Sequence, residues 1–273
     1  MALSVATNTS AATAHRYLKA NDAEASRSLA KLSSGSRIVR ASDDAASLAV
    51  GTKLKADVNA LRQAQVNASH GSSVLQVADG ALQQVSDILI RMKALATQAV
   101  TGSISDTERG YLDSEFGELA TQLDDIAAQT KFNGTALLDG AFSVDFAVGT
   151  DATNDVINVT IGQAVSAAGL GIGASSVDTA ANAQTAGTAV DAAIDLLLSA
   201  RATLGAQMSR FDFVSANLAT SVENIDAARS TLLDVDVAAE MANYSSKQVV
   251  MQASVAMLAQ ANQMPQNLLK LLG

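Results

Sequence analysis

The chain has 273 residues, of which 48% are apolar and only 3% are aromatic, and it contains one proline and no cysteine. The formal net charge of −9 argues against a nucleic-acid-binding protein, which needs a basic face. The missing cysteine excludes disulfide scaffolds, Cys-based zinc sites and thiol catalysis. Because the apolar residues are mainly Ala, Val, Leu and Ile, the composition favours closely packed helices over sandwiches or barrels.

The first predicted helix lies near the amino-terminal end. Residues 1–14 carry no charged side chain and lack the basic start and apolar run of a conventional secretory signal, so export by such a signal is unsupported and other export routes stay open. Four apolar residues at heptad-compatible spacing then indicate an amphipathic helix, namely Leu18, Ala25, Leu29 and Leu32. The serine- and glycine-containing residues 33–36 are expected to end it.

The second predicted helix is long. We expect Ser42 to cap it, with Asp43 and Asp44 in its first turn, where the helix dipole favours negative charge. Its apolar residues keep heptad spacing with one phase slip near Ala78, namely Leu54, Val58, Leu61, Ala68, Leu75, Leu82, Val85, Leu89, Met92, Ala96 and Ala99. A helix over residues 44–100 is roughly 85 Å long, whereas a compact domain of this size is about 50 Å across. The sequence therefore predicts a rod.

The middle of the chain combines a shorter helix with a β-hairpin. Ser105 and Glu108 form a capping-box pattern that predicts a helix ending near Lys131. Two runs of alternating apolar residues then predict paired strands, namely Val144, Phe146 and Val148 with Ile157, Val159 and Ile161. The Gly-, Ala- and Ser-rich stretch that follows, to about Ala186, predicts a surface loop.

Two further heptad series predict long carboxy-terminal helices. The first comprises Val190, Ile194, Leu197, Arg201, Leu204, Met208, Phe211, Ser215, Leu218, Val222, Ile225, Arg229 and Leu232. The second comprises Val237, Met241, Tyr244, Gln248, Met251, Val255, Leu258, Asn262, Pro265, Leu269 and Leu272.

Both ends of the chain are short of charge. Residues 248–269 carry no charged side chain, yet they hold five Gln, two Asn and Pro265. Those polar groups are costly in lipid, so we expect no membrane span. A helix exposed to water is normally charged on its outer face, so the uncharged ends predict burial against other protein in a homopolymer.

No residue set predicts catalysis or a cofactor. The acidic pairs Asp43–Asp44 and Asp124–Asp125 and the Asp234–Asp236 triplet contain neighbours that diverge by about 100° on a helix, so we expect capping and solvent-facing roles. Residues 169–173 read GLGIG and lack the GxGxxG pattern of a phosphate-binding loop. His15 and His70 lie on different predicted helices. We expect no metal site and no enzyme.

Short motifs in a fixed order carry a family resemblance. They are LSSGSRIVRASDDAA at 32–46, NA at 67–68 with Gly71, FNG at 132–134, LL at 137–138, RATLGA at 201–206, EN at 223–224, AARS at 227–230 and MLAQANQMPQ at 257–266. With these motifs the chain resembles bacterial flagellin, the subunit of the flagellar filament, in a short form without large outer domains.

The resemblance implies a mainly α fold, an elongated antiparallel helical rod with a terminal coiled coil and a small β-hairpin. Residues 1–40 and 236–273 would pair as terminal helices of an inner tube. Residues 41–140 and 177–235 would form the helical rod, and residues 141–176 the hairpin and loop at the tip.

The resemblance further implies a structural subunit that self-assembles into an extracellular filament for swimming motility. We expect assembly to bury apolar side chains of the terminal helices, namely Leu3, Leu18, Leu29, Leu32, Met251, Val255, Leu258, Leu269 and Leu272. Implied partners are further copies of the chain, the type III flagellar export apparatus with its chaperone, and the filament cap and hook-junction proteins. We expect no nucleic acid or membrane partner.

A host-receptor surface is a further implication. Flagellins are sensed by a Toll-like receptor through the first long rod helix and its neighbour, and Arg91, Leu95 and Glu115 match the family's recognition positions. Ile90 and Ala94 depart from them. Packing between neighbouring rods is the alternative, which we prefer.

Two other functions compete with the filament subunit. A hook–filament junction protein shares the terminal similarity, but the DDAA and MLAQANQMPQ motifs favour the filament subunit. A coiled-coil signalling or binding module would need no uncharged ends.

Overall fold

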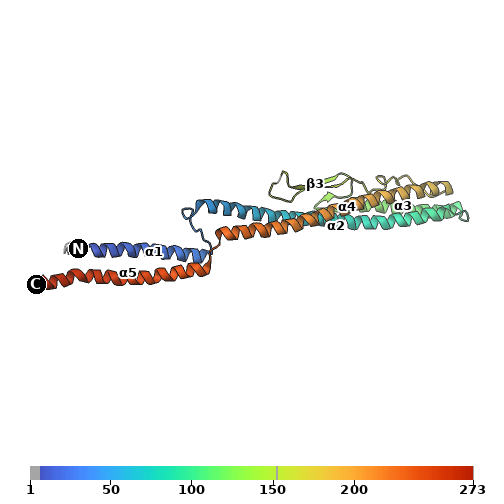
Figure 1. The fold of residues 1–273 in the computed structure, drawn as a ribbon. Helices are drawn as coiled ribbons and strands as arrows, with labels where there is room; N and C mark the ends of the chain where they lie inside the picture. Colours follow the sequence, from blue (N-terminus) through green and yellow to red (C-terminus); the bar gives the residue numbers. More distant parts are fainter. Residues whose placement is uncertain (1–6, 152, 273) are drawn as a thin grey trace. The chain divides into compact units, whose positions relative to one another are not determined.

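The computed structural model describes residues 7–151 and 153–272, with side chains described as far as Met264 in the last helix. Figure 1 shows a mainly helical fold in which the described chain forms helices α1 (Thr9–Ser34), α2 (Ala45–Val100), α3 (Asp106–Gln129), α4 (Ala180–Leu233) and α5 (Val237–Leu272). Strands β1 (Lys131–Phe132) and β2 (Thr135–Ala136) pair in one small sheet, and β3 (Phe142–Ala147) and β4 (Val156–Ile161) pair antiparallel in another. The mainly α prediction is confirmed.

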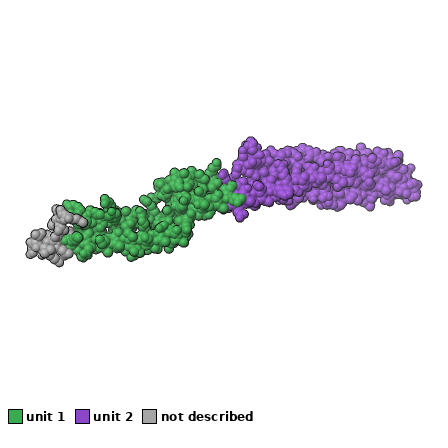
Figure 2. Space-filling model, viewed as in Figure 1, with its two compact units in different colours: residues 1–56, 224–273 green, residues 57–223 purple. Residues whose placement is uncertain are grey.

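The chain divides into two compact units, drawn in green and purple in Figure 2. Unit 1 comprises Met1–Ala56 and Asn224–Gly273, and unit 2 comprises Asp57–Glu223. The sequence had suggested divisions after residues 40 and 235, at the breaks between helices. The hairpin and the residues after it form part of unit 2 and are not a separate compact unit.

Unit 2 holds the main core between α2, α3 and α4. The α2 and α4 helices run antiparallel, because Asp79 of α2 pairs with Arg201 of α4 while Lys93, further along α2, pairs with the earlier Asp191. Buried side chains repeat at the predicted heptad spacing in both helices and include Leu75, Leu82, Leu89, Leu197, Leu204 and Phe211. The periodicity therefore predicted the buried faces of these two helices correctly.

A close approach of α2 and α4 depends on a glycine. A Cβ added at Gly71 would lie 2.5 Å from the Phe211 ring, so only a glycine lets that ring fit against α2. The ring also meets Phe146 of β3 edge-on, with the two centroids 5.7 Å apart. Phe211 thus joins both helices to the hairpin.

The helix boundaries follow capping chemistry, with one correction. Asp44, not Ser42, caps α2, because its carboxylate accepts the Ser47 backbone N–H at 3.0 Å. Hydrogen bonds from the Ser47 side chain and backbone lower the pKa of Asp44. The predicted capping box of α3 is confirmed, since Ser105 and Glu108 each accept the other's backbone N–H.

The predicted surface loop up to Ala186 was wrong. The α4 helix already begins at Ala180, and the residues between β4 and α4 bury several apolar side chains, namely Val165, Leu170, Ile172 and Val177. Two carboxylates of α3 hold this segment, because Asp124 accepts the Ala167 N–H at 2.8 Å and Asp113 accepts the Val177 N–H at 2.7 Å. Local turns, a bond from the Val165 N–H to the Leu138 carbonyl and these two carboxylates together satisfy backbone groups of the segment without a helix or strand.

Candidate interaction surface

The paired helices of unit 1 form a heptad seam. On α1 the less exposed positions recur at intervals of three and four residues, namely Ala11, Ala14, Leu18, Asn21, Ala25, Ser28 and Leu32. On α5 they are Glu240, Tyr244, Lys247, Met251, Ser254, Leu258 and Ala261. Seven such positions in each helix are the pattern of a two-helix coiled coil.

The α5 side of this seam differs from the predicted register. Tyr244, Met251 and Leu258 lie in the seam as predicted. The other seam positions of α5 are Glu240, Lys247, Ser254 and Ala261, and each lies one residue before the position that was predicted. The residues that were predicted to lie in the seam at these places are all exposed, namely Met241, Gln248, Val255 and Asn262. On α1 the same correction applies, because Ser28 is buried while the predicted Leu29 is exposed.

Polar contacts explain this choice of register. Lys247 forms an ion pair with Glu24, and Lys31 lies 3.9 Å from the Glu240 carboxylate. The Asn21 amide donates to the Ser254 hydroxyl at 3.4 Å. Polar groups at seam positions specify register at a cost in stability. Apolar periodicity alone therefore missed a register that charge matching between the two helices would have indicated.

The ion pair between Glu24 and Lys247 changes the pKa of Glu24. The Lys247 ammonium beside Glu24 lowers the pKa of that carboxyl, first through a hydrogen bond and then through the favourable charge. Both side chains are well exposed, so the pair contributes orientation more than stability.

Two apolar flanks of α5 remain exposed on either side of the seam. Measured from the middle of the seam, Met241 and Val255 lie about 75° to one side, and Val250, Met257 and Met264 lie about 75° to the other. A groove of about 320 Å³ opens along the first flank, between Leu18, Lys19 and Asp22 of α1 and Met251, Gln252 and Val255 of α5. We call these two groups the α5 flanks.

The nine predicted assembly residues divide among these environments. Leu18, Leu32, Met251 and Leu258 are half-buried in the seam, whereas Leu29 and Val255 are exposed beside it. Leu3 lies outside the described residues, and so do the side chains of Leu269 and Leu272.

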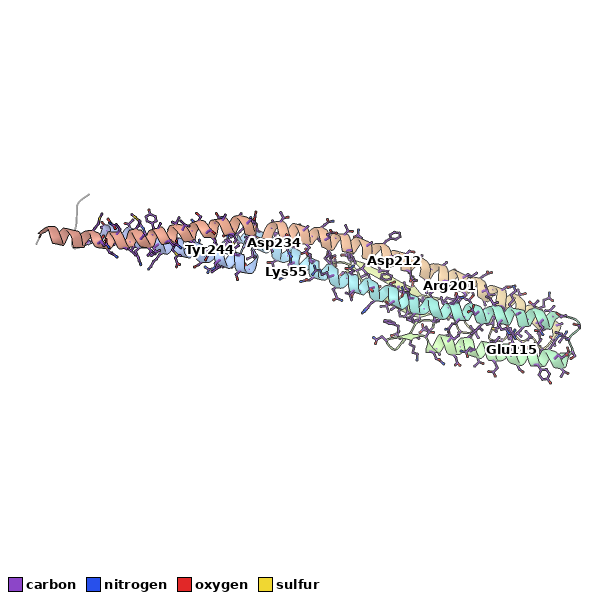
Figure 3. The ribbon with its side chains drawn as sticks, turned by 90° about the horizontal axis from the view of Figure 1, so that it is seen from below. Lys55, Glu115, Arg201, Asp212, Asp234 and Tyr244 are labelled. Atoms are coloured by element: carbon purple, nitrogen blue, oxygen red, sulfur yellow. The ribbon has the colours of Figure 1, made fainter. Side chains whose placement is uncertain are left out.

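The three predicted receptor residues do not share one surface. The Arg91 guanidinium donates to the Glu115 carboxylate at 2.5 and 2.8 Å, and both side chains are exposed. Figure 3 shows Glu115 on α3 in unit 2. Leu95 is only 1% exposed, because it is part of the core of unit 2. It is therefore not part of the exposed surface.

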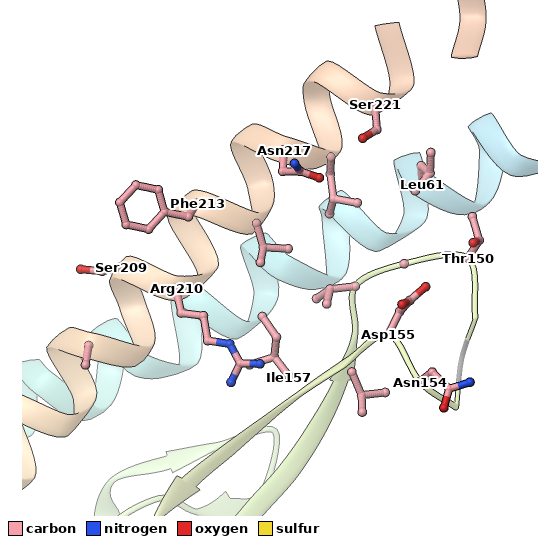
Figure 4. A pocket seen from close by; sticks show the side chains of 16 residues that line it. Leu61, Thr150, Asn154, Asp155, Ile157, Ser209, Arg210, Phe213, Asn217 and Ser221 are labelled. Atoms are coloured by element: carbon pink, nitrogen blue, oxygen red, sulfur yellow. The ribbon is translucent and has the colours of Figure 1, made fainter. Parts of the chain in front are cut away.

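A cavity of about 800 Å³ lies in unit 2, between the β3–β4 loop and α4. Figure 4 shows Arg210 extending from α4 towards Ile157, whereas Phe213 points away from the hairpin. Phe213 is 78% exposed. The lining of this cavity combines apolar residues with polar ones, namely Thr150, Asn154, Asp155, Ser209, Arg210, Asn217 and Ser221.

The other sequence candidates have structural roles. Asp43 accepts the Arg40 N–H and Asp236 accepts the Ala239 N–H at the start of α5. In the GLGIG turn the backbone N–H groups of residues 170–173 bond to carbonyls of residues 166–168, so they are not free to hold a phosphate. Among the residues that the structure describes, no three His, Cys, Asp or Glu side chains are placed to share a metal ion. Within the same part of the chain, no helix has the length and apolarity needed to span a bilayer.

Comparisons with known proteins match both halves of the chain. Residues 5–143 match the bacterial flagellin N-terminal helical region, and residues 188–272 match the bacterial flagellin C-terminal helical region. The chain is 38% identical to the flagellin of Halalkalibacterium halodurans and 36% identical to the flagellar filament 30.7 kDa core protein of Treponema maltophilum. Each alignment covers 97% of this chain and 98% of the relative.

Solved structures agree with this assignment. The crystal structure of Bacillus cereus flagellin is 33% identical, with a TM-score of 0.51 over 60% of this chain and 94% of that chain. A putative flagellar hook-associated protein from Vibrio parahaemolyticus, 15% identical with a TM-score of 0.58 over 70% of this chain and all of that one, shares the fold alone. The chain belongs to the bacterial flagellin family, and it is a structural subunit of the extracellular flagellar filament.

Proposed function

We propose that this flagellin assembles by packing the α5 flanks against the terminal helices of neighbouring subunits, so that the helices of unit 1 become buried only in the filament. The observation that carries the proposal is the exposure of Met241, Val255 and Met257 on a helix whose residues 248–264 have no charge. Apolar side chains exposed on an uncharged helix mark a candidate protein–protein interface.

The composition of the α1–α5 seam supports coupled folding and assembly. Asn21, Ser28 and Ser254 occupy positions where a self-sufficient coiled coil carries aliphatic side chains. A helix pair with so polar a seam gains little from its own apolar contacts, and most helical stability in proteins comes from packing of an apolar face. Neighbouring subunits would supply the missing burial.

The full proposed contact set keeps the residues expected from the sequence. It comprises Leu3, Leu18, Leu29, Leu32, Met251, Val255, Leu258, Leu269 and Leu272, of which Leu29 and Val255 are free for contact with a second copy. We assign Leu18, Leu32, Met251 and Leu258 a second role, because they hold α1 against α5 within the subunit.

Deletion of residues 248–273 tests the proposal. The truncated chain should stay soluble and helical, because the core of unit 2 is untouched, but it should sediment as a monomer and form no filaments by electron microscopy. A point variant, Val255→Asp, should have the same effect, whereas Ala256→Asp, on the exposed face of α5 opposite the seam and about 100° from either flank, should assemble. Normal filaments from the truncation would refute the proposal.

The remaining partners follow from the same role. We assign this chain a purely structural function without enzymatic activity, export through the flagellar type III apparatus, and a chaperone that covers α5 before export. The filament cap and hook-junction proteins would contact the ends of the polymer. Exposure of apolar residues on α5 supports the need for a chaperone.

For the exposed Arg91–Glu115 pair we favour packing between neighbouring subunits over recognition by a Toll-like receptor. The pair satisfies its own charges within the subunit, and Leu95, the third matching residue, is buried in the core. A receptor-reporter assay with Arg91→Ala checks this choice, since loss of a strong wild-type signal would favour the receptor.

A further inference from the structure

The methionines of this chain are concentrated on one helix. Four of the seven lie on α5, at positions 241, 251, 257 and 264. Met257, Met264 and Met241 are 63%, 51% and 48% exposed, respectively, whereas Met92 in the core of unit 2 is fully buried. The three exposed thioethers all belong to the α5 flanks.

Exposed thioethers react with peroxides. The sulfur takes one oxygen atom from hydrogen peroxide, the O–O bond breaks and water leaves, so the sulfur is oxidised by two electrons while the peroxide is reduced. The product, methionine sulfoxide, replaces a flexible apolar side chain with a polar one. Such oxidation disrupts methionine-rich interfaces and is reversed by methionine sulfoxide reductases.

The position of these residues gives the reaction a consequence. Met241 lies with Val255 on one flank, and Met257 and Met264 lie with Val250 on the other. A sulfoxide on either flank would put a strong hydrogen-bond acceptor in place of an apolar side chain, on a helix without charged side chains over residues 248–264, and burying such a group without a donor is unfavourable. In the free subunit water hydrates the sulfoxide oxygen, whereas in an assembled subunit the buried oxygen would lose that hydration.

We propose that Met241, Met257 and Met264 form an oxidation site through which peroxide controls assembly. The inference rests on the proposed packing of the α5 flanks against a second copy of this chain. That occupant is supported by membership of a filament-forming family, by the absence of charge over residues 248–264, and by the continuity of the flanks with the α1–α5 seam. Oxidation at the three sulfurs makes the subunit assembly-incompetent, and reduction restores it.

The experiment treats purified monomer with hydrogen peroxide, removes the oxidant, and follows polymerisation by light scattering and electron microscopy. Peptide mass spectrometry assigns each added oxygen. Met257, Met264 and Met241 should oxidise first, Met251 more slowly and Met92 last, in the order of their burial. Polymerisation should slow by about tenfold or more per oxidised flank residue. Peroxide forms both epimers of the sulfoxide, so treatment with the two methionine sulfoxide reductases, one for each epimer, should restore the original rate.

The matched variant is Met241→Leu with Met257→Leu and Met264→Leu. Leucine conserves volume and apolarity, so this variant should assemble at close to the wild-type rate and keep that rate after peroxide. Wild-type protein that assembles normally with the three sulfoxides in place would overturn the proposal. It would equally be overturned if the leucine variant stayed peroxide-sensitive, or if reductase failed to restore assembly of the oxidised wild type.

Preassembled filaments separate this inference from the proposed function. If the flanks are covered by a second copy, Met257 and Met264 should oxidise at least about tenfold more slowly in filaments than in monomers. Equal rates in both states would contradict packing of the flanks, and with it the proposed function. Slow oxidation in filaments combined with normal assembly of oxidised monomers would contradict the oxidation site alone.

Discussion

The two units of this flagellin differ in charge and in burial. Unit 1 has 11 basic and 8 acidic residues, whereas unit 2 has 7 basic and 19 acidic residues, so the negative charge of the chain belongs to unit 2. Fully buried apolar side chains show the same division. In the part of unit 1 that the structure describes they are only Ala25, Ile38 and Ala261, whereas unit 2 contains the whole main core.

The two units therefore differ in how they bury their apolar side chains. Unit 2 buries its large side chains within one subunit and covers them with an acidic surface, which keeps a protein soluble. Unit 1 leaves Val255, Met257 and Leu29 exposed and uses polar residues in its own seam. A part with a large core of its own and a part with few buried apolar side chains therefore lie in the same chain.

The largest expected effect comes from breaking the core of unit 2. Phe211→Ala removes a ring that is packed against Gly71 and Phe146 and should cost about 3–5 kcal/mol of unfolding free energy. Calorimetry should show the melting temperature of unit 2 falling by roughly 10 °C. Phe213→Ala, at an exposed position of the same helix, is the control and should change stability by less than about 0.5 kcal/mol. Equal effects of both variants would contradict the assignment of the core.

A smaller change in stability, this time a stabilisation, is expected in unit 1. Asn21→Leu combined with Ser254→Leu replaces a polar seam contact by an apolar one and should stabilise the α1–α5 pair by about 1–2 kcal/mol. Hydrogen exchange of α1 and α5 in the monomer should then slow by about tenfold. Ser246→Leu, at an exposed position of α5, should leave exchange unchanged. If hydrogen exchange were unchanged in the double variant, Asn21 and Ser254 would not limit the stability of the α1–α5 pair.

The smallest effect is a pH dependence confined to unit 1. Lys247 lowers the pKa of Glu24 in the folded seam, so the unfolded chain binds more protons than the folded one as the pH falls. The stabilisation is complete above the ordinary Glu pKa of about 4.3 and is lost as the pH drops through the lowered folded value.

Circular dichroism melts between pH 7 and pH 3 measure this loss. Glu24→Gln should have a flatter pH dependence than the wild type, because it removes the group that titrates. If the two proteins lost helix in parallel over this range, the Glu24–Lys247 pair would not be responsible.

Local sequence patterns were sufficient to predict the helices and strands in which apolar residues follow a single period. The long second helix was predicted over residues 44–100 and runs from Ala45 to Val100. The capping box at Ser105 and Glu108 located α3, and alternating apolar residues located β3 and β4. In each case the signal lies within a few residues of the chain, so no distant contact was needed to interpret it.

Two features depended on contacts between distant residues. The buried segment before α4 has no period of its own, and it is ordered by Asp113 and Asp124 of α3. The seam register of α5 was missed because Met241 and Val255 are more apolar than Lys247 and Ser254, which occupy the seam. Apolar periodicity cannot distinguish a flank reserved for another subunit from a seam within the same one.

The sequence by itself determined the helices, the hairpin and the resemblance to flagellin, because heptad spacing, caps and short motifs are local properties. Only the tertiary structure decided which face of α5 meets α1, which residues stay exposed beside that seam, and that Leu95 lies in the core. These outcomes depend on cross-helix pairs such as Glu24–Lys247, whose members are far apart in the chain. Their energies arise only once the two helices have come together.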